Sequence, residues 1–555
     1  MLDRKGLGDA LVGDLIVARK GRGRARVERV LGSSKRIENV LEALLVEEGL
    51  RTEFEPFKLP EPDFEGRTDL RDLVAFTIDP ETAEDFDDAI FVRAEGNGLR
   101  AWVHIADVSW FVSAGSPLDH GATRRGNSVY VPRLVAPMLP HELADDACSL
   151  RPHVDRLCVT MEIPFDGALQ PGVPSFYRSV IRSRARLTYG QAEAILAGRE
   201  QVESEIAEGL QLTRRLAEEL RRRRFERGAL RVESRELAFA FDGSGGVERA
   251  WFEAEPRAHM LVEELMILAN EAVAELLAGR RREALYRVHE RPEPQSIQLL
   301  LAKLADLGVP TPPAPDAEAM SPSDAARLAA EASERVTEYV KQSGRGAEAF
   351  PALVLRALKQ ARYDPRNLGH SGLASTAYCH FTSPIRRYPD LVCHRALLRE
   401  IGQGDEPLPE DLVEVADHTS LTERDAAQVE WRADELCLAW LLEAELYQRG
   451  WEAPFGGEII GIIPSGLFVR FGEVFEGYVP ARRLPGDYFQ LNEHGTALVG
   501  RRSGKPYRLG DEIEVLVDDI RRSEGKVELA LSAPDGAGGD RGRRGSRRGP
   551  RRARR

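Results

Sequence analysis

A strongly acidic stretch of the chain offers its clearest chemistry. Six acidic residues lie from Asp79 to Asp88, and no basic residue stands among them. Two carboxylates about 5 Å apart repel each other by roughly 3 kcal/mol at an effective dielectric of 20, so we expect a cation to neutralise them. The ligands on offer are all oxygens, which favours a hard cation, Mg²⁺ or Mn²⁺, over zinc. A solvated acidic loop is the alternative that these residues leave open.

The spacing of the acids separates candidate motifs. An EF-hand beginning at Asp85 would need glycine and then glutamate where the chain has Ile90 and Gly96, so that motif is excluded. If the loop is extended, Asp85 and Asp87 project to one side. The two outer aspartates of the stretch would then close the site from neighbouring turns.

Several segments must position this stretch. Apolar runs at 73–78, 89–92, 101–108 and 158–163 predict strands, and helical spacing dominates from about residue 190 to 450. Five alternating runs within 456–532, separated by Gly, Pro and Asp, predict a small closed β-barrel of the OB type. The first 60 residues predict a small β-type fragment followed by a helix. A length of 555 residues predicts three to four domains in all.

Composition excludes other classes of protein. A hydrophobic content of 42% and a charged content of 30% are typical of a globular protein with more than one core. No run of about 18 apolar residues is present, so we expect no membrane partner. Residues 1–15 lack the apolar region of a secretory signal. Five scattered cysteines fit a reducing cytoplasm, which is the expected location.

The charge is unevenly distributed. Nine arginines and no acidic residue fall within 541–555, and because the total net charge is −13, residues 1–540 carry −22. The Arg, Gly, Ser and Pro composition predicts a disordered tail over 533–555. Its field would attract polyanions, of which nucleic acid is the commonest. A solubilising or incidental tail is the alternative.

Motifs spread along the chain resemble one family. The acidic stretch, with Asp79, Asp85, Asp87 and Asp88 at their spacing, resembles the catalytic motif of the RNB family, the ribonuclease II and ribonuclease R exoribonucleases. Further matches follow in the family's order at 104–109, 126–132, 137–140, 148–150 with 155–156, 285–290, 372–374 and 380–390. Together they extend over more than 300 residues, so coincidence is a poor explanation.

The resemblance implies an enzyme and its catalytic residues. The expected activity is hydrolytic, processive 3′-to-5′ degradation of single-stranded RNA to nucleoside 5′-monophosphates. Two Mg²⁺ ions, which Mn²⁺ can replace, would be held by Asp79, Asp85, Asp87 and Asp88, with Asp87 the most important for cleavage. One ion would lower the pKa of the attacking water while the other stabilised the leaving 3′ oxygen. Arg386 would contact the scissile phosphate.

The residues around Arg386 predict how it is presented. Ser383 and Pro384 have the types of an N-cap and a first helical residue, which predicts a helix start with free N–H groups for a phosphate. Pro389 then interrupts that helix, so only its first turn is expected to be regular.

The resemblance also assigns residues to RNA. Tyr130 is expected to stack on the 3′-terminal base, and Glu263 or its neighbour Glu264 to lie near the last nucleotides. The full expected set is Tyr130, Tyr189, Glu263, Arg387, Glu430, Phe468 and Tyr478. A buried core role is the alternative for Tyr189. His104 and Asp107, by contrast, are expected to be structural.

The implied fold class is α+β and multidomain. It comprises an RNB catalytic domain of mixed sheet and helices at 69–450 and an S1 (OB-fold) barrel at 456–532. A small OB-like or winged-helix-like module at 1–60 precedes them. In the barrel Phe468, Phe475 and Tyr478 are candidates for stacking, at least one of which is expected inside, and Arg470, Arg482 and Arg483 are expected near the RNA backbone.

The expected partner is the single-stranded 3′ end of RNA, bound by a monomer with no small-molecule cofactor beyond the metal. The alternative is a catalytically silent RNB-like RNA-binding protein, which would lack some of the four aspartates or Arg386. A metal phosphatase of the Asp-x-Asp kind is disfavoured because Ala89 stands where its motif needs Thr or Val. The basic tail favours a ribonuclease R-like enzyme that acts on structured RNA with a 3′ overhang, whereas the short front end does not.

Overall fold

The computed structural model describes residues 8–20, 25–50, 52–231, 236–243, 245–253 and 257–532. Its largest part is built on a seven-stranded sheet with the strand order β11-β4-β5-β6-β9-β10-β3. The strands are β3 (Thr68–Asp69), β4 (Phe76–Asp79), β5 (Asp88–Glu95), β6 (Gly98–Ala106), β9 (Asp155–Phe165), β10 (Ser175–Arg182) and β11 (Ala185–Thr188). The five inner strands are antiparallel, while β11 and β3 pair in parallel at the two edges. The predicted mixed sheet is confirmed.

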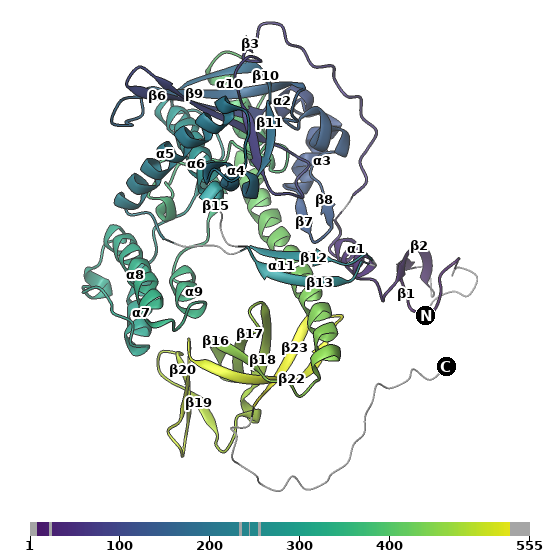
Figure 1. Ribbon diagram of the computed structural model, residues 1–555, viewed down its shortest axis with the longest axis vertical. Coiled ribbons are helices and arrows are strands. Elements are labelled where there is room, and N and C mark those ends of the chain that lie inside the picture. The colour runs from purple at the N-terminus through teal and green to yellow at the C-terminus, as the bar shows by residue number, and fades with distance from the viewer. Residues whose placement is uncertain are drawn as a thin grey trace.

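Both faces of this sheet are covered. Along β9, Val159, Met161 and Ile163 belong to one core and Cys158 to another, as the two-residue period of a strand requires. Helices α5 (Ser204–Glu226) and α6 (Arg257–Gly279) pack on the first face, against β5 and β6 (Figure 1). The opposite core is closed by α2 (Val108–Phe111), α3 (Pro117–Arg125) and α10 (Tyr388–Glu400).

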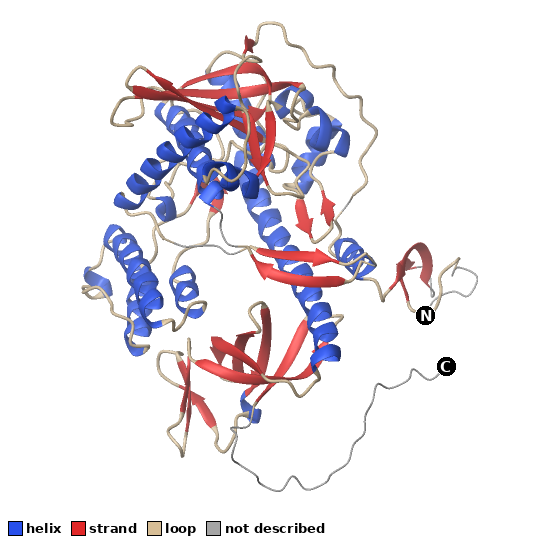
Figure 2. Cartoon of the chain, viewed as in Figure 1, coloured by secondary structure: helices blue, strands red, loops and turns tan. Residues whose placement is uncertain are grey.

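A single long helix joins this domain to the C-terminal one. Helix α11 (Leu412–Arg449) has 38 residues, about 57 Å at 1.5 Å per residue. It runs from the sheet domain to the barrel in Figures 1 and 2. Along the way it contacts the hairpin β7–β8 (Val129–Val131 and Leu134–Ala136) and the hairpin β12–β13 (Leu237–Phe241 and Val247–Phe252).

The C-terminal domain is a closed barrel, as predicted. Its strands are β16 (Phe455–Ile463), β17 (Gly466–Phe471), β18 (Phe475–Pro480), β22 (Glu512–Arg521) and β23 (Lys526–Leu531). Phe475 is buried in its core beside Phe471 and Leu529, so this is the expected aromatic that faces inward. The sequence patterns missed a three-stranded sheet of β19 (Phe489–Leu491), β20 (Ala497–Gly500) and β21 (Pro506–Arg508) inserted before β22.

A helical unit links the two domains on the other side. Its helices are α7 (Pro294–Asp306), α8 (Pro322–Ser343) and α9 (Ala349–Arg356). Arg345 ties it to the barrel: Nε donates to Asp511 Oδ1 at 3.0 Å, and Nη2 donates to the Leu509 carbonyl at 3.2 Å. Three short elements, α4 (Tyr189–Leu196), β14 (Tyr286–Val288) and β15 (Arg362–Asp364), complete the part between α3 and α10.

The N-terminal region is small. Strands β1 (Asp14–Lys20) and β2 (Ala25–Ser33) form one antiparallel hairpin, and α1 (Ile37–Glu47) packs on α11. In the described part of 1–60 this hairpin and helix stand in place of a complete OB barrel, which needs five strands. The predicted tail, 533–555, lies outside the described residues. No helix among the described residues is long and apolar enough to cross a membrane.

Candidate active site

The acidic stretch connects two paired strands of the sheet. Asp79 is the last residue of β4 and Asp88 the first of β5, and the two strands pair at Phe76 and Ile90. The connecting loop is held from both sides. The Phe86 N–H donates to Ser149 Oγ at 3.0 Å, and the Ala106 N–H donates to the Asp87 carbonyl at 2.9 Å. Strand ends and loop are thereby fixed, and the four aspartates cannot drift apart.

Burial makes the charged form of these carboxylates costly. Burial raises the pKa of Asp79 to about 6 and that of Asp88 to about 8, where nearby Asp79 adds to the effect. It also raises the pKa of Asp87 well above its ordinary value, although Arg386 opposes the shift. Asp79 Oδ2 and Asp87 Oδ2 are buried and accept no hydrogen bond. Each is a polar oxygen that burial makes costly unless something pairs with it.

The donor set fits a hard divalent cation. It consists of carboxylate oxygens, two of which are buried and accept no hydrogen bond, and burial raises the pKa of Asp79 and Asp88, so a cation would favour their charged form. The side chains are neighbours without forming a closed cage. Among the described residues, no three acidic, histidine or cysteine side chains converge as a ready metal site.

Arg386 lies against Asp87. Its Nε is 3.6 Å from Asp87 Oδ2, and the Ile385 N–H donates to Asp87 Oδ1 at 2.9 Å. The Arg386 side chain is 47% exposed, so its guanidinium is open to a ligand on the loop side. One turn of chain therefore presents both a backbone donor and a cation to the same carboxylate.

The single turn predicted after Ser383 is present, but it is not assigned as a helix, and Ser383 is not the N-cap of α10. Residues 383–387 form one turn, in which the Arg387 N–H donates to the Ser383 carbonyl at 3.0 Å, and regular helix begins only at Tyr388. Pro389 explains the difference. It has no N–H to continue a helix from this turn, and it fits instead in the first turn of α10.

Arg387 is engaged by the fold. Its Nε donates to Asp390 Oδ2 at 2.9 Å and its Nη2 to Asp390 Oδ1 at 2.8 Å. Asp390 is fully buried and also accepts the Ser383 N–H at 2.8 Å. Arg387 thus forms an ion pair that holds the turn carrying Arg386, while its expected contact with RNA stays a prediction.

Two residues expected at the RNA end meet at this site. The Tyr130 hydroxyl donates to Asp85 Oδ2 at 2.6 Å, and its backbone N–H donates to Glu430 Oε1 of α11 at 2.8 Å. Tyr130 is 37% exposed, which leaves part of its ring open. Tyr189 follows β11 directly. Burial and the nearby charges of Asp88 and Asp79 raise its pKa, so it lies beside the carboxylates.

Glu263 and Glu264 are held elsewhere. Arg224 Nη2 lies 3.1 Å from Glu263 Oε1, and Arg224 Nε donates to Glu264 at 3.2 Å. In the described part of the chain, no hydrogen bond or ion pair joins either glutamate to the four aspartates. Arg224 lies on a neighbouring helix, so the short motif around Glu263 and Glu264 could not reveal this pairing.

The barrel aromatics divide between surface and core. Phe468 and Tyr478 are cross-strand partners with ring centroids 5.3 Å apart, and Phe468 is 41% exposed. Arg470 is less available than expected, because it pairs with Glu348 and Glu476. Arg482 and Arg483 lie near Glu528 at 3.5 and 3.2 Å.

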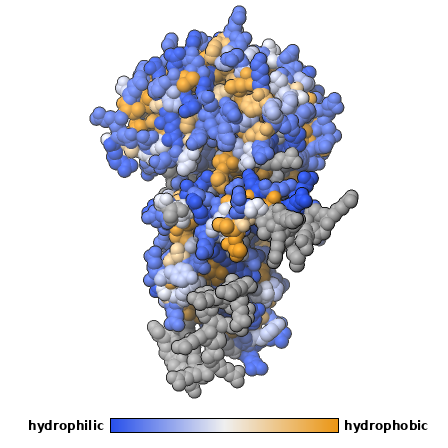
Figure 3. Space-filling model, turned by 90° about the vertical axis from the view of Figure 1, so that its right-hand side faces the viewer, coloured by the Kyte–Doolittle hydropathy of each residue, from blue (hydrophilic) through white to orange (hydrophobic). Residues whose placement is uncertain are grey.

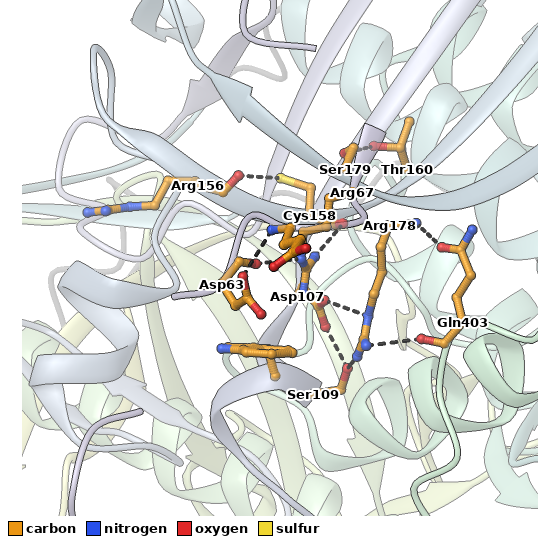
Figure 4. Close-up of polar contacts among 12 residues, drawn as sticks. Asp63, Arg67, Asp107, Ser109, Arg156, Cys158, Thr160, Arg178, Ser179 and Gln403 are labelled. Atoms are coloured by element: carbon orange, nitrogen blue, oxygen red, sulfur yellow. Dashed lines mark hydrogen bonds and ion pairs between the residues drawn. The ribbon is translucent and has the colours of Figure 1, made fainter. Parts of the chain in front are cut away.

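His104 and Asp107 belong to the scaffold. His104 is fully buried, which lowers its pKa to about 3, and its Nδ1 shares a hydrogen bond with Thr160. Figure 4 shows Asp107 between Arg67 and Arg178, whose nitrogens lie 2.8 and 3.0 Å from it. Burial alone would raise the pKa of Asp107, but the two arginines lower it below its ordinary value.

Comparison with known proteins identifies two domain families in this chain. Residues 67–402 match the RNB domain, and residues 452–532 match the S1 RNA binding domain. Ribonuclease R of Escherichia coli is 37% identical over 523 residues, covering 88% of this chain and 62% of that protein. Ribonuclease R of Aquifex aeolicus is 34% identical, covering 92% of this chain and 73% of that protein. The chain thus spans less than two thirds of the length of the first of these relatives.

A solved structure has the same fold. The structure of Mycoplasma genitalium RNase R in complex with ribose methylated single-stranded RNA superposes with a TM-score of 0.86 and 27% sequence identity. The match covers 96% of this chain and 85% of that one.

Proposed function

The chain belongs to the RNB family, and from this premise we propose that it is a hydrolytic, processive 3′-to-5′ exoribonuclease that releases nucleoside 5′-monophosphates. The observation that carries the proposal is the set of four aspartates beside Arg386, two of which have a buried oxygen that accepts no hydrogen bond. Support comes from the Ribonuclease R relatives and from the RNA-bound Mycoplasma genitalium structure.

The metal would be held by Asp79, Asp85, Asp87 and Asp88. When bound there, two Mg²⁺ ions would supply activation of the attacking water and stabilisation of the leaving 3′ oxygen. The chain's own contribution is to hold the carboxylates in place. The Ile385 N–H fixes one oxygen of Asp87, and the Tyr130 hydroxyl fixes one oxygen of Asp85.

Other residues would bind and orient the RNA. Arg386, whose side chain is 47% exposed, would bind the phosphate next to Asp87. The open part of the Tyr130 ring would stack on the terminal base, a contact that suits any sequence. Phe468 and Tyr478 would guide the strand on the barrel surface. The proposal includes a cytoplasmic monomer, and the five cysteines, all buried and unpaired, support the reducing location.

The test compares two variants of the same loop. Asp87→Asn should abolish degradation of a 5′-labelled single-stranded RNA in Mg²⁺ while RNA binding stays within about twofold, because the lost charge serves the chemistry. Glu84→Gln is the matched control, since Glu84 is an exposed acid of that loop whose side chain has no partner among the described residues, and it should be fully active. Full activity of Asp87→Asn would refute the assignment.

The same assay tests the alternatives. A wild-type protein that binds RNA without shortening it would be the silent RNB-like protein, although the presence of all four aspartates and Arg386 disfavours it. A duplex RNA with a 3′ overhang, run beside the single strand, shows whether structured RNA is degraded.

A further inference from the structure

A large groove lies along α11, and neither the four aspartates nor Arg386 is among the described residues that line it. Its volume is about 1350 Å³, and it is walled by residues of α3, of segments 48–50 and 53–55, of the β7–β8 region and of the β22–β23 turn. Along α11 it follows one helical stripe, which includes Glu414, Asp425 and Arg432. Glu430, which holds Tyr130, lies outside that stripe. The groove is therefore separate from the acidic loop.

The groove is strongly acidic. Among the described residues, nine acidic and four basic side chains line it. Three of the basic groups already have an acidic neighbour in the groove: Arg124 lies 3.5 Å from Glu55, Arg432 2.7 Å from Glu48, and Lys526 3.4 Å from Glu524. Four acids that line it, Glu53, Glu410, Glu414 and Asp425, have no side-chain hydrogen bond or ion pair with any described residue. The surplus repels RNA and favours a cationic occupant.

The groove also offers aromatic surface to such an occupant. Trp431 lines it and is 60% exposed. The wall already holds one stacked cation, because the Arg125 guanidinium lies 4.2 Å from the centre of the Phe54 ring. Guanidinium groups bind carboxylates and stack on aromatic rings more readily than ammonium groups do. An arginine-rich segment therefore fits this surface better than a lysine-rich one.

Figure 1 places α1, α3 and the β7–β8 hairpin on the same side of α11, and Figure 3 views the molecule from that side. Hydrophilic and apolar side chains meet there at the waist between the sheet domain and the barrel. The barrel end of the groove is formed by the β22–β23 turn, which precedes the last described strand.

We propose that this groove is the docking site of the chain's own arginine-rich segment, residues 541–555. That segment has nine arginines and no acidic residue. The segment begins close enough to the groove along the chain to reach it. β23 runs back from the turn over about 20 Å, and the nine residues 532–540 can span about 30 Å, so residue 541 reaches the rim of the groove. In this arrangement the acids of the groove compete with RNA phosphates for the same arginines.

The experiment uses the full chain and measures how fast trypsin cleaves the tail. Cleavage is monitored through the mass of the intact protein. Replacing three unpaired groove acids together, Glu410→Gln, Glu414→Gln and Asp425→Asn, should speed tail cleavage about tenfold, at about twofold per exposed ion pair. The control replaces three exposed, unpaired acids of α5, Glu205→Gln, Glu208→Gln and Glu218→Gln, and should cleave like the wild type. In 1 M NaCl the wild type should become as fast as the groove variant.

A second measurement locates the tail directly. In an Arg548→Lys chain, carbodiimide coupling should join residue 548 to Glu410, Glu414 or Asp425, and the linked peptides are read by mass spectrometry. Equal tail cleavage in the wild type and the groove variant would overturn the proposal, as would crosslinks spread over the acidic surface. Protection that increased with protein concentration would also overturn it, because the tail would then be docking on a second copy. None of these readouts depends on nuclease activity.

Discussion

Replacing Asp390 by asparagine is the most informative change at the turn that carries Arg386. The Asp390 carboxylate is fully buried and accepts three hydrogen bonds, one from the Ser383 N–H and two from Arg387. Asparagine keeps the size and can keep the bond from Ser383, so the substitution removes the charge and the one oxygen that accepts from Arg387 Nε, which an amide NH2 group cannot replace. Arg387 is then left as an uncompensated cation, which costs about 3 kcal/mol, the lower end for breaking a buried pair.

The substitution should change both the local stability of this turn and the rate of RNA degradation. A loss of about 3 kcal/mol from the opening free energy of this turn raises amide exchange by about 100-fold. The Ser383 and Ile385 amides should show it in hydrogen exchange followed by mass spectrometry. Because the Ile385 N–H holds Asp87, RNA degradation should fall in parallel.

A second substitution provides the control. Arg387→Met in the Asp390→Asn background removes the stranded cation, so exchange should return to within about tenfold of the wild type. If Asp390→Asn alone exchanges at the wild-type rate, the ion pair does not hold the turn. If the double variant is no better than the single one, the loss has another origin.

Three further outcomes are expected. Because burial raises the pKa of Asp79 to about 6 and of Asp88 to about 8, the metal-free protein should lose thermal stability as pH rises from 5 to 8.5. Mg²⁺ should restore the lost stability and displace protons from these carboxyl groups. Calorimetry in two buffers of different ionisation enthalpy counts the protons released, and no release at pH 7 would contradict the raised pKa values. Tyr130→Ala should weaken RNA binding by about 1–3 kcal/mol whereas Tyr130→Phe should not, as fluorescence anisotropy would show. Arg345→Ala should speed amide exchange in the barrel by about tenfold, for the loss of partly buried hydrogen bonds to Asp511 and Leu509, whereas the exposed Arg356→Ala should not.

The parts that the sequence predicted well are those with local periodicity. The five barrel strands alternate over six to ten residues, so their pattern is legible. Strands β19 to β21 have only three or four residues each, too few to show a period, and were missed. The acidic loop was visible because its acids are adjacent in the chain.

Long-range partners were beyond the reach of sequence patterns. The Tyr130 N–H meets Glu430 across 300 positions, and Ile385 meets Asp87 across 298. No local pattern encodes such a pairing. The Arg387–Asp390 pair could have been predicted, since both residues lie in one motif three positions apart. The sequence does not show, however, whether Asp390 is buried, and burial decides whether the arginine pairs with it or binds a ligand.

The continuity of helix α11 links motion of the barrel to the position of Tyr130. The same rigid rod fixes the backbone of Tyr130 through Glu430 and, further along, packs on strands of the barrel. Because one unbroken helix makes both contacts, a shift of the barrel that moves α11 along its axis also displaces the backbone of Tyr130. Under the proposed function, motion of the barrel and alignment of the last nucleotide would therefore be mechanically coupled.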